Sequence, residues 1–457
     1  MKLVQALRVR PREVVSLVGA GGKTTIMLRL ADELAARGQR VVITTTTHLY
    51  AWQAAQAKAH ILYLPCQPLQ VLTDRLAEHL DRHSYCAVSG PLDPDMDKVS
   101  GVPTELIEAL TASSYVDVVL VEADGARGRS LKAPAEHEPV VPACTTLLVP
   151  VVGVDVLGRP LTNGYVHRPE RVAQLAGVAT GTPISPQIVA SVLTHPQGGC
   201  KGWRPGMRLL PFINKVERAP SGHSCDALTQ ACQLADHLLA CAWIEAAAIG
   251  AVQLPDPVWQ VRGRVGAVVL AAGAASRYGA LKQLLPWGSG TLLSQVVDTA
   301  LSSQADPVVV VLGHQSEMCR AALGNRAVTV AINSEWKQGQ SSSVRAGLTA
   351  LRPDVQAALF LLADQPRVKV ATLDALIERH RTTLAPVVWP EYAGRRGNPV
   401  LFDRSLFPEL SRLSEDVGGR VVLASYAAYA ERVPVDDPGI LFDIDTPDDY
   451  VGADQSG

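Results

Sequence analysis

The sequence lacks three features that would each indicate a particular class of protein. Positive charge is not in excess, because 42 lysines and arginines stand against 44 aspartates and glutamates and give a net charge of -2. No apolar run approaches the roughly 18 residues of a membrane-spanning helix, and the N-terminus lacks the apolar core of a secretory signal. The eight cysteines contain no Cys-x-x-Cys pair. We therefore expect no nucleic-acid partner, no membrane partner and no zinc site.

The rest of the composition is that of a folded cytoplasmic protein. Hydrophobic residues make up 47% of the chain and charged residues 19%, which is ordinary for a soluble globular protein. At 457 residues the chain exceeds the length at which one hydrophobic core stops growing. Two domains with reduced, structural cysteines are therefore expected.

Short apolar runs alternate with helix-length amphipathic stretches along most of the chain, which is typical of α/β proteins with parallel sheets covered by helices. In the first half we expect strands near residues 14–18, 40–44, 117–121, 146–150, 209–213 and 246–249. A second series is expected at 265–270, 307–312, 357–362 and 386–389. Residues 251–263 contain two prolines and no helical periodicity, and they predict a linker between domains 1–250 and 264–457.

The stretch LAAGAASRYGALKQLLP, residues 270–286, follows a predicted strand with glycines and then cations. Gly273 and Gly279 would let the backbone approach the oxygens of a triphosphate. Arg277 and Lys282 would supply positive charge to that triphosphate and to a leaving pyrophosphate. A glycine turn with two surface cations is the alternative interpretation.

Two acidic segments favour the phosphate-binding interpretation. LLADQP places Asp364 at the C-terminal end of an apolar strand, where ligands of open α/β sheets bind. FDIDTPDDY carries Asp443 and Asp445 near the end of the chain. Carboxylates from such distant segments could hold one Mg²⁺ against an α-phosphate, although each alone is more often a turn or helix-cap residue.

These segments make roughly the last 190 residues resemble the molybdenum cofactor cytidylyltransferases. Besides the glycine loop, the resemblance rests on NSEWKQGQSSSVRAGL (333–348), ADQP (363–366), GNPVLF (397–402), SEDVGGR (414–420) and DIDTPDD (443–449). The sequence departs from the family where Ala275 replaces a frequent serine, Asn398 replaces the histidine of GHPV, and Glu415 and Gly419 alter the GD.GAR motif. The departures leave the details of the acceptor site open.

The resemblance implies a Rossmann-like nucleotidyltransferase domain with assigned site residues. It places the nucleotide phosphates at Gly273, Arg277 and Lys282, and Mg²⁺ at Asp364 and Asp445. The same resemblance brings the serines of GQSSS near the nucleotide, and a helix N-cap is an equally good interpretation of Ser341 and Ser342.

The reaction implied is transfer of CMP from CTP to molybdenum-molybdopterin, with release of pyrophosphate, for delivery to an apo-molybdenum hydroxylase. A phosphate monoester is already an anionic nucleophile near neutral pH, so positioning and charge neutralisation suffice. Ala272 matches the LAAG of cytidylyl members, whereas guanylyl members usually have LAGG. GTP or a sugar phosphate remains an alternative substrate, and a non-catalytic carrier of the finished cofactor is an alternative function.

In the first half, VSLVGAGGKTT (15–25) resembles a phosphate-binding loop between a strand and a helix. Leu17 takes the place of the first glycine of the usual P-loop, so the spacing is closer to the GxxGKT form of Mur-ligase-like ATPases. The N–H cradle would come from Gly19, Gly21 and Gly22, the phosphate-binding ammonium from Lys23 and a magnesium ligand from Thr24.

Two further segments extend this N-terminal site. VEADG offers Glu122 and Asp124 at a strand end, where a second metal-side acid belongs, and we assign Asp124 to the metal; strand-end acids that cap helices are the alternative. FINKVE resembles the guanine-reading NKxD element, so Asn214 and Lys215 could contact a base, and GTP and ATP both stay open.

Together with TTTTH (44–48), these segments resemble the YqeC-like accessory proteins of selenium-dependent hydroxylases over most of residues 10–250. His48 is a candidate residue, although a packing histidine is the more usual outcome. This second resemblance implies a role in molybdenum hydroxylase maturation rather than a defined reaction.

Overall fold

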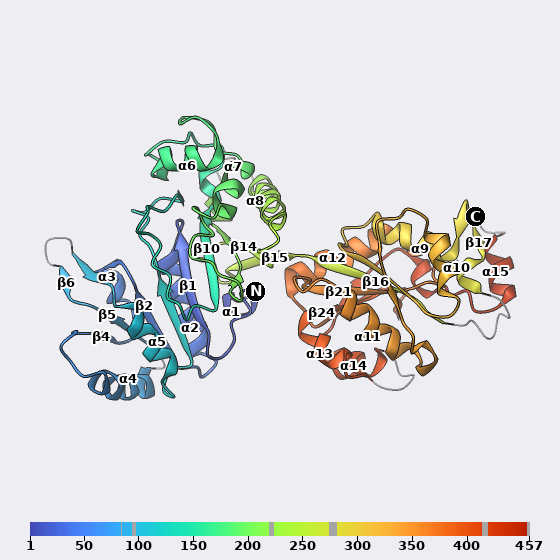
Figure 1. Cartoon of the computed structure of the whole chain (residues 1–457), viewed down its shortest axis with the longest axis horizontal. Helices are drawn as coiled ribbons and strands as arrows, with labels where there is room; N and C mark the ends of the chain where they lie inside the picture. The colour runs from blue at the N-terminus through green and yellow to red at the C-terminus, as the bar shows by residue number, and fades with distance from the viewer. Residues whose placement is uncertain (84, 94–96, 219–223, 274–280, 414–418, 455–457) are drawn as a thin grey trace. The chain divides into compact units, whose positions relative to one another are not determined.

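Figure 1 shows the chain in a computed structural model, which describes residues 1–83, 85–93, 97–218, 224–273, 281–413 and 419–454. The chain folds as two compact units, Met1–Arg262 and Gly263–Gly457. Both units are α/β, as the sequence pattern predicts. Within the described residues, no helix is both long enough and apolar enough to span a bilayer.

The first unit is built on a large sheet with the strand order β15-β14-β13-β10-β1-β8-β2-β5-β4, and β12 also pairs with β10. β1 lies between β10 and β8 and is parallel to both. All six residues of β1 are buried, which explains why its sequence, VVSLVG, is nearly all apolar rather than alternating. The parallel arrangement brings the C-terminal ends of β1, β8 and β10 to one edge of the sheet.

The strands of this sheet are β1 Val14–Gly19, β2 Val41–Thr45, β4 His60–Leu62, β5 Tyr85–Ser89, β8 Val118–Glu122, β10 Leu147–Gly153, β12 Arg208–Leu209, β13 Phe212–Asn214, β14 Ala246–Gly250 and β15 Val258–Gly263. Smaller sheets contain β3 His48–Tyr50, β6 Leu92–Asp93 and β7 Lys98–Ser100, and β9 Leu131–Lys132 with β11 Val166–His167. The helices are α1 Leu3–Ala6, α2 Lys23–Ala35, α3 Ala51–Ala54, α4 Leu69–His83, α5 Thr104–Ala112, α6 Pro169–Ala176, α7 Pro186–Thr194 and α8 Ser224–Leu239.

The segment 251–263 is not the linker that its prolines suggested. Residues 258–263 form β15, which pairs with β14 and has four of its six residues buried. The preceding residues are held by Arg29 of α2, which donates hydrogen bonds to the carbonyl oxygens of Val252 (3.0 Å), Leu254 (2.5 Å) and Pro255 (2.6 Å). Proline removes a backbone donor but keeps its carbonyl acceptor, so the prolines do not prevent the segment from being fixed.

We expect Arg29→Ala to loosen residues 252–257 while the sheet stays folded. Hydrogen bonds from a charged donor contribute about 1–3 kcal/mol each, and their loss should speed amide hydrogen exchange in this segment about tenfold or more. Mass-spectrometric hydrogen exchange on the whole chain measures this. Arg37→Ala, which changes an exposed arginine just beyond α2, is the matched control, and equal exchange in both variants would contradict the assignment.

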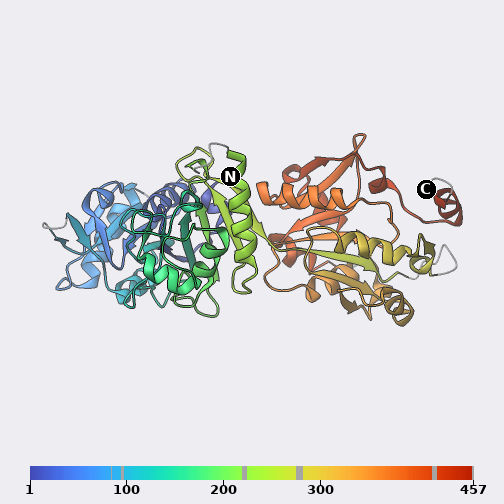
Figure 2. The same cartoon turned by 90° about the horizontal axis from the view of Figure 1, so that it is seen from above.

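The second unit contains a mixed sheet with the order β20-β19-β16-β21-β24-β22-β23, to which β25 adds beside β22. β16 is parallel to β19 and β21. Its residues alternate between two cores: Val265, Ala267 and Val269 face one, and Val268 faces the other. Helices α9 and α12 pack on the first face and α11 and α13 on the second, so that helices flank the sheet on both sides (Figure 2).

The strands of this unit are β16 Val265–Ala271, β17 Pro286–Trp287, β18 Gly290–Thr291, β19 Val308–Leu312, β20 Thr329–Ile332, β21 Ala357–Leu362, β22 Val387–Tyr392, β23 Arg395–Arg396, β24 Val400–Asp403 and β25 Glu431–Pro434. The helices are α9 Leu292–Leu301, α10 Ser316–Leu323, α11 Gln340–Ala350, α12 Val370–Thr383, α13 Phe407–Leu410, α14 Arg420–Ser425 and α15 Pro447–Asp454.

The sheet of the second unit is parallel in its centre and mixed at one side. β24 runs antiparallel to both β21 and β22. The chain reverses direction after β22 at Ala393 and Gly394, which both have positive φ. This turn joins β22 to β23 as a hairpin. The pattern of apolar runs predicted the parallel strands but did not reveal β24, because GNPVLF is short and begins with turn residues.

Candidate functional sites

A lysine joined to two carboxylates marks the C-terminal end of the central strands in the second unit. The Nζ atom of Lys282 lies 2.6 Å from Asp364 Oδ2 and 3.0 Å from Asp445 Oδ1, and it also donates to the carbonyl oxygen of Ile444 at 3.1 Å. Asp364 follows β21 by two residues, and its backbone carbonyl accepts the N–H of Ile444. The predicted residues Lys282, Asp364 and Asp445 therefore come together from three distant segments.

The charges of this cluster depend on one another. Burial opposes the charge of Lys282, but Asp364 and Asp445 raise its pKa above the ordinary lysine value. Desolvation and the negative charge of Asp364 raise the pKa of Asp443, whose Oδ1 accepts a hydrogen bond from the Gln365 amide. The second oxygen of Asp364, Oδ1, is buried and accepts no hydrogen bond from any described residue. One carboxylate oxygen is thus left available for a cation.

The remaining predicted residues of the glycine loop are only partly described. A Cβ atom on Gly273, two residues beyond β16, would meet no atom of the described residues within 4 Å. Its carbonyl oxygen accepts a hydrogen bond of 2.7 Å from the buried Gln283 amide. Arg277 and Gly279 lie outside the described residues, and their assignments stay predictions.

The serines of GQSSS lie in the first turn of α11, whose N-cap residue is Gly339. Neither Ser341 nor Ser342 is the N-cap that the sequence left open, because Gly339, with a φ of +94°, takes that position. The Ser342 hydroxyl donates to the Gly339 carbonyl (2.8 Å) and accepts from the Asn333 amide (2.8 Å). Both serines are buried, Ser342 bonds the residues that precede α11, and the approach of either serine to a nucleotide stays a prediction.

A cavity of about 140 Å³ lies between the strand ends and α11. Apolar side chains form its wall, including Phe360 and Phe402, whose rings pack edge to face with centroids 5.8 Å apart. Arg396 and Asn398 contribute polar groups to its lining. The residue that departs from the GHPV motif, Asn398, therefore borders a cavity rather than the metal-side carboxylates.

In the first unit, the glycines of GAGG are required by close backbone contacts as well as by a turn. Gly19, Gly21 and Gly22 all have positive φ. A Cβ atom on Gly19 would lie 2.5 Å from the Val151 carbonyl oxygen, and one on Gly21 would lie 2.4 Å from the backbone nitrogen of Gly153. β10 therefore presses against the loop and fixes its path into α2, which begins at Lys23.

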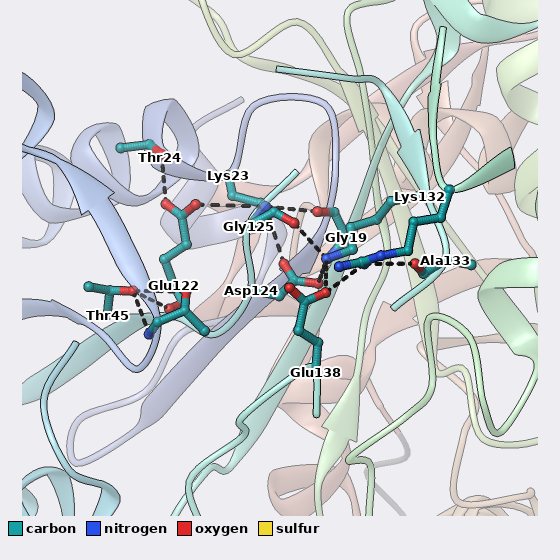
Figure 3. A network of polar contacts seen from close by, with 12 residues as sticks. Gly19, Lys23, Thr24, Thr45, Glu122, Asp124, Gly125, Lys132, Ala133 and Glu138 are labelled. Carbon is teal, nitrogen blue, oxygen red and sulfur yellow. Dashed lines mark hydrogen bonds and ion pairs between the residues drawn. The ribbon is translucent and has the colours of Figure 1, made fainter. Parts of the chain in front are cut away.

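Figure 3 shows the polar network at the C-terminal ends of β1 and β8. The ammonium of Lys23 bonds the Gly19 carbonyl at 2.7 Å and lies 3.2 Å from Asp124 Oδ1 and 3.7 Å from Glu122 Oε1. Thr24 donates its hydroxyl hydrogen to Glu122 Oε2 at 2.6 Å. The predicted loop residues and both predicted acids are thus in one cluster.

The two acids of this network have different neighbours. Asp124 Oδ2 accepts the Gly19 N–H at 3.1 Å and pairs with the buried Lys132 at 2.9 Å (Figure 3). Asp124 is therefore enclosed by two lysines and the loop backbone, whereas Glu122 lies beside Thr24. Burial raises the pKa of Glu122, although Lys23 and the Thr24 hydroxyl favour its charged form. Glu122 is therefore the acid in contact with Thr24, and the assignment of Asp124 to a metal stays a prediction.

Asn214 and Lys215 have partners within the protein, and their assignment to a nucleotide base stays a prediction. The buried Asn214 amide donates to the Gly21 carbonyl (2.8 Å), and its oxygen accepts the Val252 N–H (3.0 Å). Lys215 bonds the Ser130 hydroxyl (2.7 Å) and pairs with Asp155 (3.1 Å). Asn214 therefore positions the glycine loop and the end of β14.

The structure also places the candidate residue His48 in β3 with an exposed side chain.

Lys132 and Glu138 were missed by the sequence analysis. Glu138 pairs with Lys132 at 2.9 Å and with Arg168 at 2.8 Å. No spacing rule would have revealed these contacts, because β9 carries Lys132 behind the loop and Arg168 lies just beyond β11. Three cations and three carboxylates of the network, counting Lys23, Glu122 and Asp124, balance its charge.

Comparison with known proteins assigns each unit to a family. The family model for YqeC protein matches residues 15–170, and that for the MobA-like NTP transferase domain matches residues 267–432. YqeC of Escherichia coli is 34% identical over 49% of this chain and 84% of its own length. The chain belongs to the YqeC family in its first unit and to the MobA-like NTP transferase family in its second.

The relatives of the transferase unit are named for different activities. Nicotine blue oxidoreductase of Paenarthrobacter nicotinovorans is 31% identical over 40% of this chain and 92% of its own length. Molybdenum cofactor cytidylyltransferase of Escherichia coli is 25% identical over 41% and 95%. The crystal structure of a Mycobacterium tuberculosis Rv0371c homolog, from Mycobacterium sp. strain JC1, is 32% identical and covers 42% of this chain and 96% of its own, with a TM-score of 0.39.

Among the described residues, no group of three or more His, Cys, Asp or Glu side chains is arranged to hold a metal ion. The assignment of Mg²⁺ to Asp364 and Asp445 stays a prediction, and Asp364 Oδ1 is the buried acceptor that such an ion would contact.

Replacement of Lys282 by methionine should strengthen metal binding in the absence of nucleotide. The ammonium now neutralises the carboxylates of Asp364 and Asp445, and its removal leaves them to a divalent cation. We expect the Mn²⁺ bound through Asp364 to bind about tenfold more tightly, which corresponds to about 1.4 kcal/mol, in titrations followed by electron paramagnetic resonance.

Two control variants define that measurement. Asp364→Asn identifies which part of the bound Mn²⁺ belongs to this site. Lys369→Met removes an exposed lysine five residues from Asp364 whose ammonium bonds a backbone carbonyl. Equal Mn²⁺ affinity in Lys282→Met and Lys369→Met would contradict the role of Lys282.

The YqeC unit should lose stability in acid through Glu138. Burial opposes its charge, but hydrogen bonds from Arg168 and Lys132 lower the pKa of Glu138 to about 2. Since this is below its unfolded value of about 4.3, the stabilisation is present above that pH and is lost as the pH falls toward 2.

We expect Glu138→Gln to cost about 2 kcal/mol at pH 7 and about half of that at pH 3, where a carboxyl with a folded pKa of about 2 is still mostly ionised. The urea concentration at which peptides from residues 118–138 lose hydrogen-exchange protection, measured on the whole chain at both pH values, reports this. Glu136→Gln, two residues away, is the control. A cost that is the same at pH 7 and pH 3 would be inconsistent with a charge effect.

Proposed function

We propose that the transferase unit moves CMP from CTP to molybdenum-molybdopterin, giving the cytosine dinucleotide cofactor and pyrophosphate. The observation that carries the proposal is the convergence of Lys282, Asp364 and Asp445 at the end of the central strands. The family provides nucleotidyl transfer. The cofactor would then pass to an apo-molybdenum hydroxylase, as the YqeC-like resemblance of the first unit suggests.

The chemistry needs charge neutralisation more than a base. A terminal phosphate oxygen of the acceptor attacks the α-phosphorus of CTP, a new P–O bond forms, and the bond to the bridging oxygen breaks so that pyrophosphate leaves with its electron pair. Bound Mg²⁺ would neutralise the phosphates. Lys282 would release the two carboxylates and pair with the phosphate oxygens, where a positioned cation stabilises the charge of the transition state.

The choice of substrates is supported by sequence rather than by the site geometry. Molybdenum cofactor cytidylyltransferase is a relative over nearly its full length, and Ala272 matches the cytidylyl form of the loop. Other relatives that match this unit over most of their length are named for other processes. The acceptor must therefore be tested directly. The cavity beside Phe360 and Arg396 supports an acceptor with both a ring system and an anionic group.

The decisive measurement is pyrophosphate release by the purified chain with Mg²⁺ and molybdenum-molybdopterin, comparing CTP with GTP, ATP and UTP. We expect CTP-selective turnover. Asp364→Asn should lower kcat by about 10²–10³, in the range typical for loss of one group that stabilises transition-state charge. Asp448→Asn, which changes an exposed aspartate near Asp445, should leave turnover within about twofold.

The alternatives give different outcomes in the same assay. GTP-selective turnover, or turnover with a sugar phosphate in place of molybdopterin, would keep the reaction and change the substrates. Pyrophosphate release by no nucleotide, from folded protein that still binds the cytosine dinucleotide cofactor, would favour the carrier function and overturn the proposal.

A further inference from the structure

Two segments that carry the carboxylates of the transferase unit run alongside each other. One contains residues 364–369, between β21 and α12, and the other contains residues 437–445, which we call the acidic segment. The N–H of Ile444 donates to the Asp364 carbonyl oxygen at 3.1 Å. The position of Asp445, the next residue, therefore depends on how the acidic segment is aligned against its neighbour.

Further contacts hold the two segments together in reverse order of sequence. The Gln365 amide donates to Asp443, and the guanidinium of Arg367 lies over the Phe442 ring, 4.5 Å from its centroid. Gly439 has no room for a side chain, because a Cβ atom there would lie 2.3 Å from the Arg367 carbonyl oxygen. Residue numbers fall along one segment as they rise along the other, so the two segments are antiparallel.

The contact farthest from the carboxylate cluster is made by Asp437, which is only 1% exposed. Its Oδ2 atom accepts hydrogen bonds from the Lys369 N–H at 2.9 Å and from the Thr372 hydroxyl at 2.6 Å, where α12 begins. Its Oδ1 atom accepts the Gly439 N–H at 3.0 Å. One buried carboxylate thus joins the start of α12 to the start of the acidic segment.

This carboxylate is a stronger anchor than a neutral capping group would be. A polar group removed from water is destabilising unless hydrogen bonds replace its hydration, and hydrogen bonds to an ionised group are roughly twice as strong as neutral ones. Both oxygens of Asp437 accept from donors. Asparagine could not make the same bonds, because its NH₂ group would face one of those donors.

We propose that Asp437 is a positioning residue for the transfer reaction and acts by holding the Asp445 carboxylate beside Asp364 and Lys282. Burial does not fix Asp445, since its side chain is 55% exposed. The anchor lies at the opposite end of the paired segments and sets their alignment without contacting the carboxylates of the cluster. This role rests on the proposed function and adds to it a residue that lies outside the sequence motifs.

The experiment compares Asp437→Asn with Asp436→Asn in the whole chain. Asp436 is the exposed neighbour, and its backbone carbonyl, which accepts the Lys369 ammonium, is kept in the variant. Mn²⁺ binding without nucleotide is followed by electron paramagnetic resonance, and Asp445→Asn identifies the part that depends on this carboxylate. We expect Asp437→Asn to weaken that part about tenfold, as is typical when a group that orients a ligand is lost, and Asp436→Asn to change it less than about twofold.

Turnover gives a second readout. Asp437→Asn should lower kcat about tenfold or more and leave the KM for CTP within about threefold, because a displaced catalytic group loses transition-state stabilisation rather than substrate binding. In the Asp445→Asn chain, Asp437→Asn should have no further effect on kcat or on Mn²⁺ affinity. A positioning residue acts only through the group that it positions, so the two changes are not additive.

Two further variants separate positioning from stability. Thr372→Val removes one hydrogen bond to Asp437 but keeps those from the two N–H groups. It should lower the unfolding temperature while Mn²⁺ affinity and kcat stay within about twofold. Gly439→Ala keeps the carboxylate but pushes the acidic segment away from Arg367, and it should weaken Mn²⁺ binding as Asp437→Asn does.

Three outcomes would overturn the proposal. They are equal Mn²⁺ affinity in Asp437→Asn and Asp436→Asn, additive losses in the double variant, and wild-type Mn²⁺ binding that does not depend on Asp445. None of them requires turnover. A wild-type chain that releases no pyrophosphate but shows the expected Mn²⁺ differences would reject the transfer reaction and still support the positioning of Asp445 by Asp437.

Discussion

Each unit depends on one interaction, a lysine ammonium held between carboxylates at the C-terminal ends of parallel strands. Lys282 lies between Asp364 and Asp445, and Lys23 lies near Glu122 and Asp124. An ion pair removed from water must recover the cost of desolvation through close contacts, and both lysines do so by also bonding a backbone carbonyl. The pairs keep together carboxylates that would otherwise repel each other, and in each unit they do so at the C-terminal edge of the sheet.

The parallel sheets create this arrangement. Because parallel neighbours end at the same edge, residues as distant in sequence as Thr24 and Glu122 come within 2.6 Å. The glycines then let the backbone pass close to the next strand, as Gly19 and Gly21 do at β10. A side chain at either position would push the loop away from β10 and separate Lys23 from its carboxylates. The path of the glycine loop therefore determines whether Lys23 can pair with its carboxylates.

The sequence predicted the parts of this arrangement that depend on apolar runs and on motifs. The buried strands ending at Gly19, Glu122, Ala271 and Leu362 were found because parallel central strands are continuously apolar. The polar and short strands were missed: β5 contains tyrosine, cysteine and serine, and β24 follows a hairpin. Segment 251–263 was misjudged because the carbonyl groups that Arg29 binds have no counterpart in the pattern of side chains.

The assignment of the two acids in VEADG shows where the limit lies. Along an extended strand, residues two apart point to the same side, so Glu122 and Asp124 are equivalent by pattern. β8 ends at Glu122, however, and the chain turns before Asp124. The longer Glu122 side chain reaches Thr24, and the shorter Asp124 reaches the Gly19 N–H and Lys132, a residue eight positions further on. The point at which the strand stops decides which carboxylate reaches Thr24 and which reaches the loop backbone, and that point depends on backbone hydrogen bonding that side-chain types do not encode.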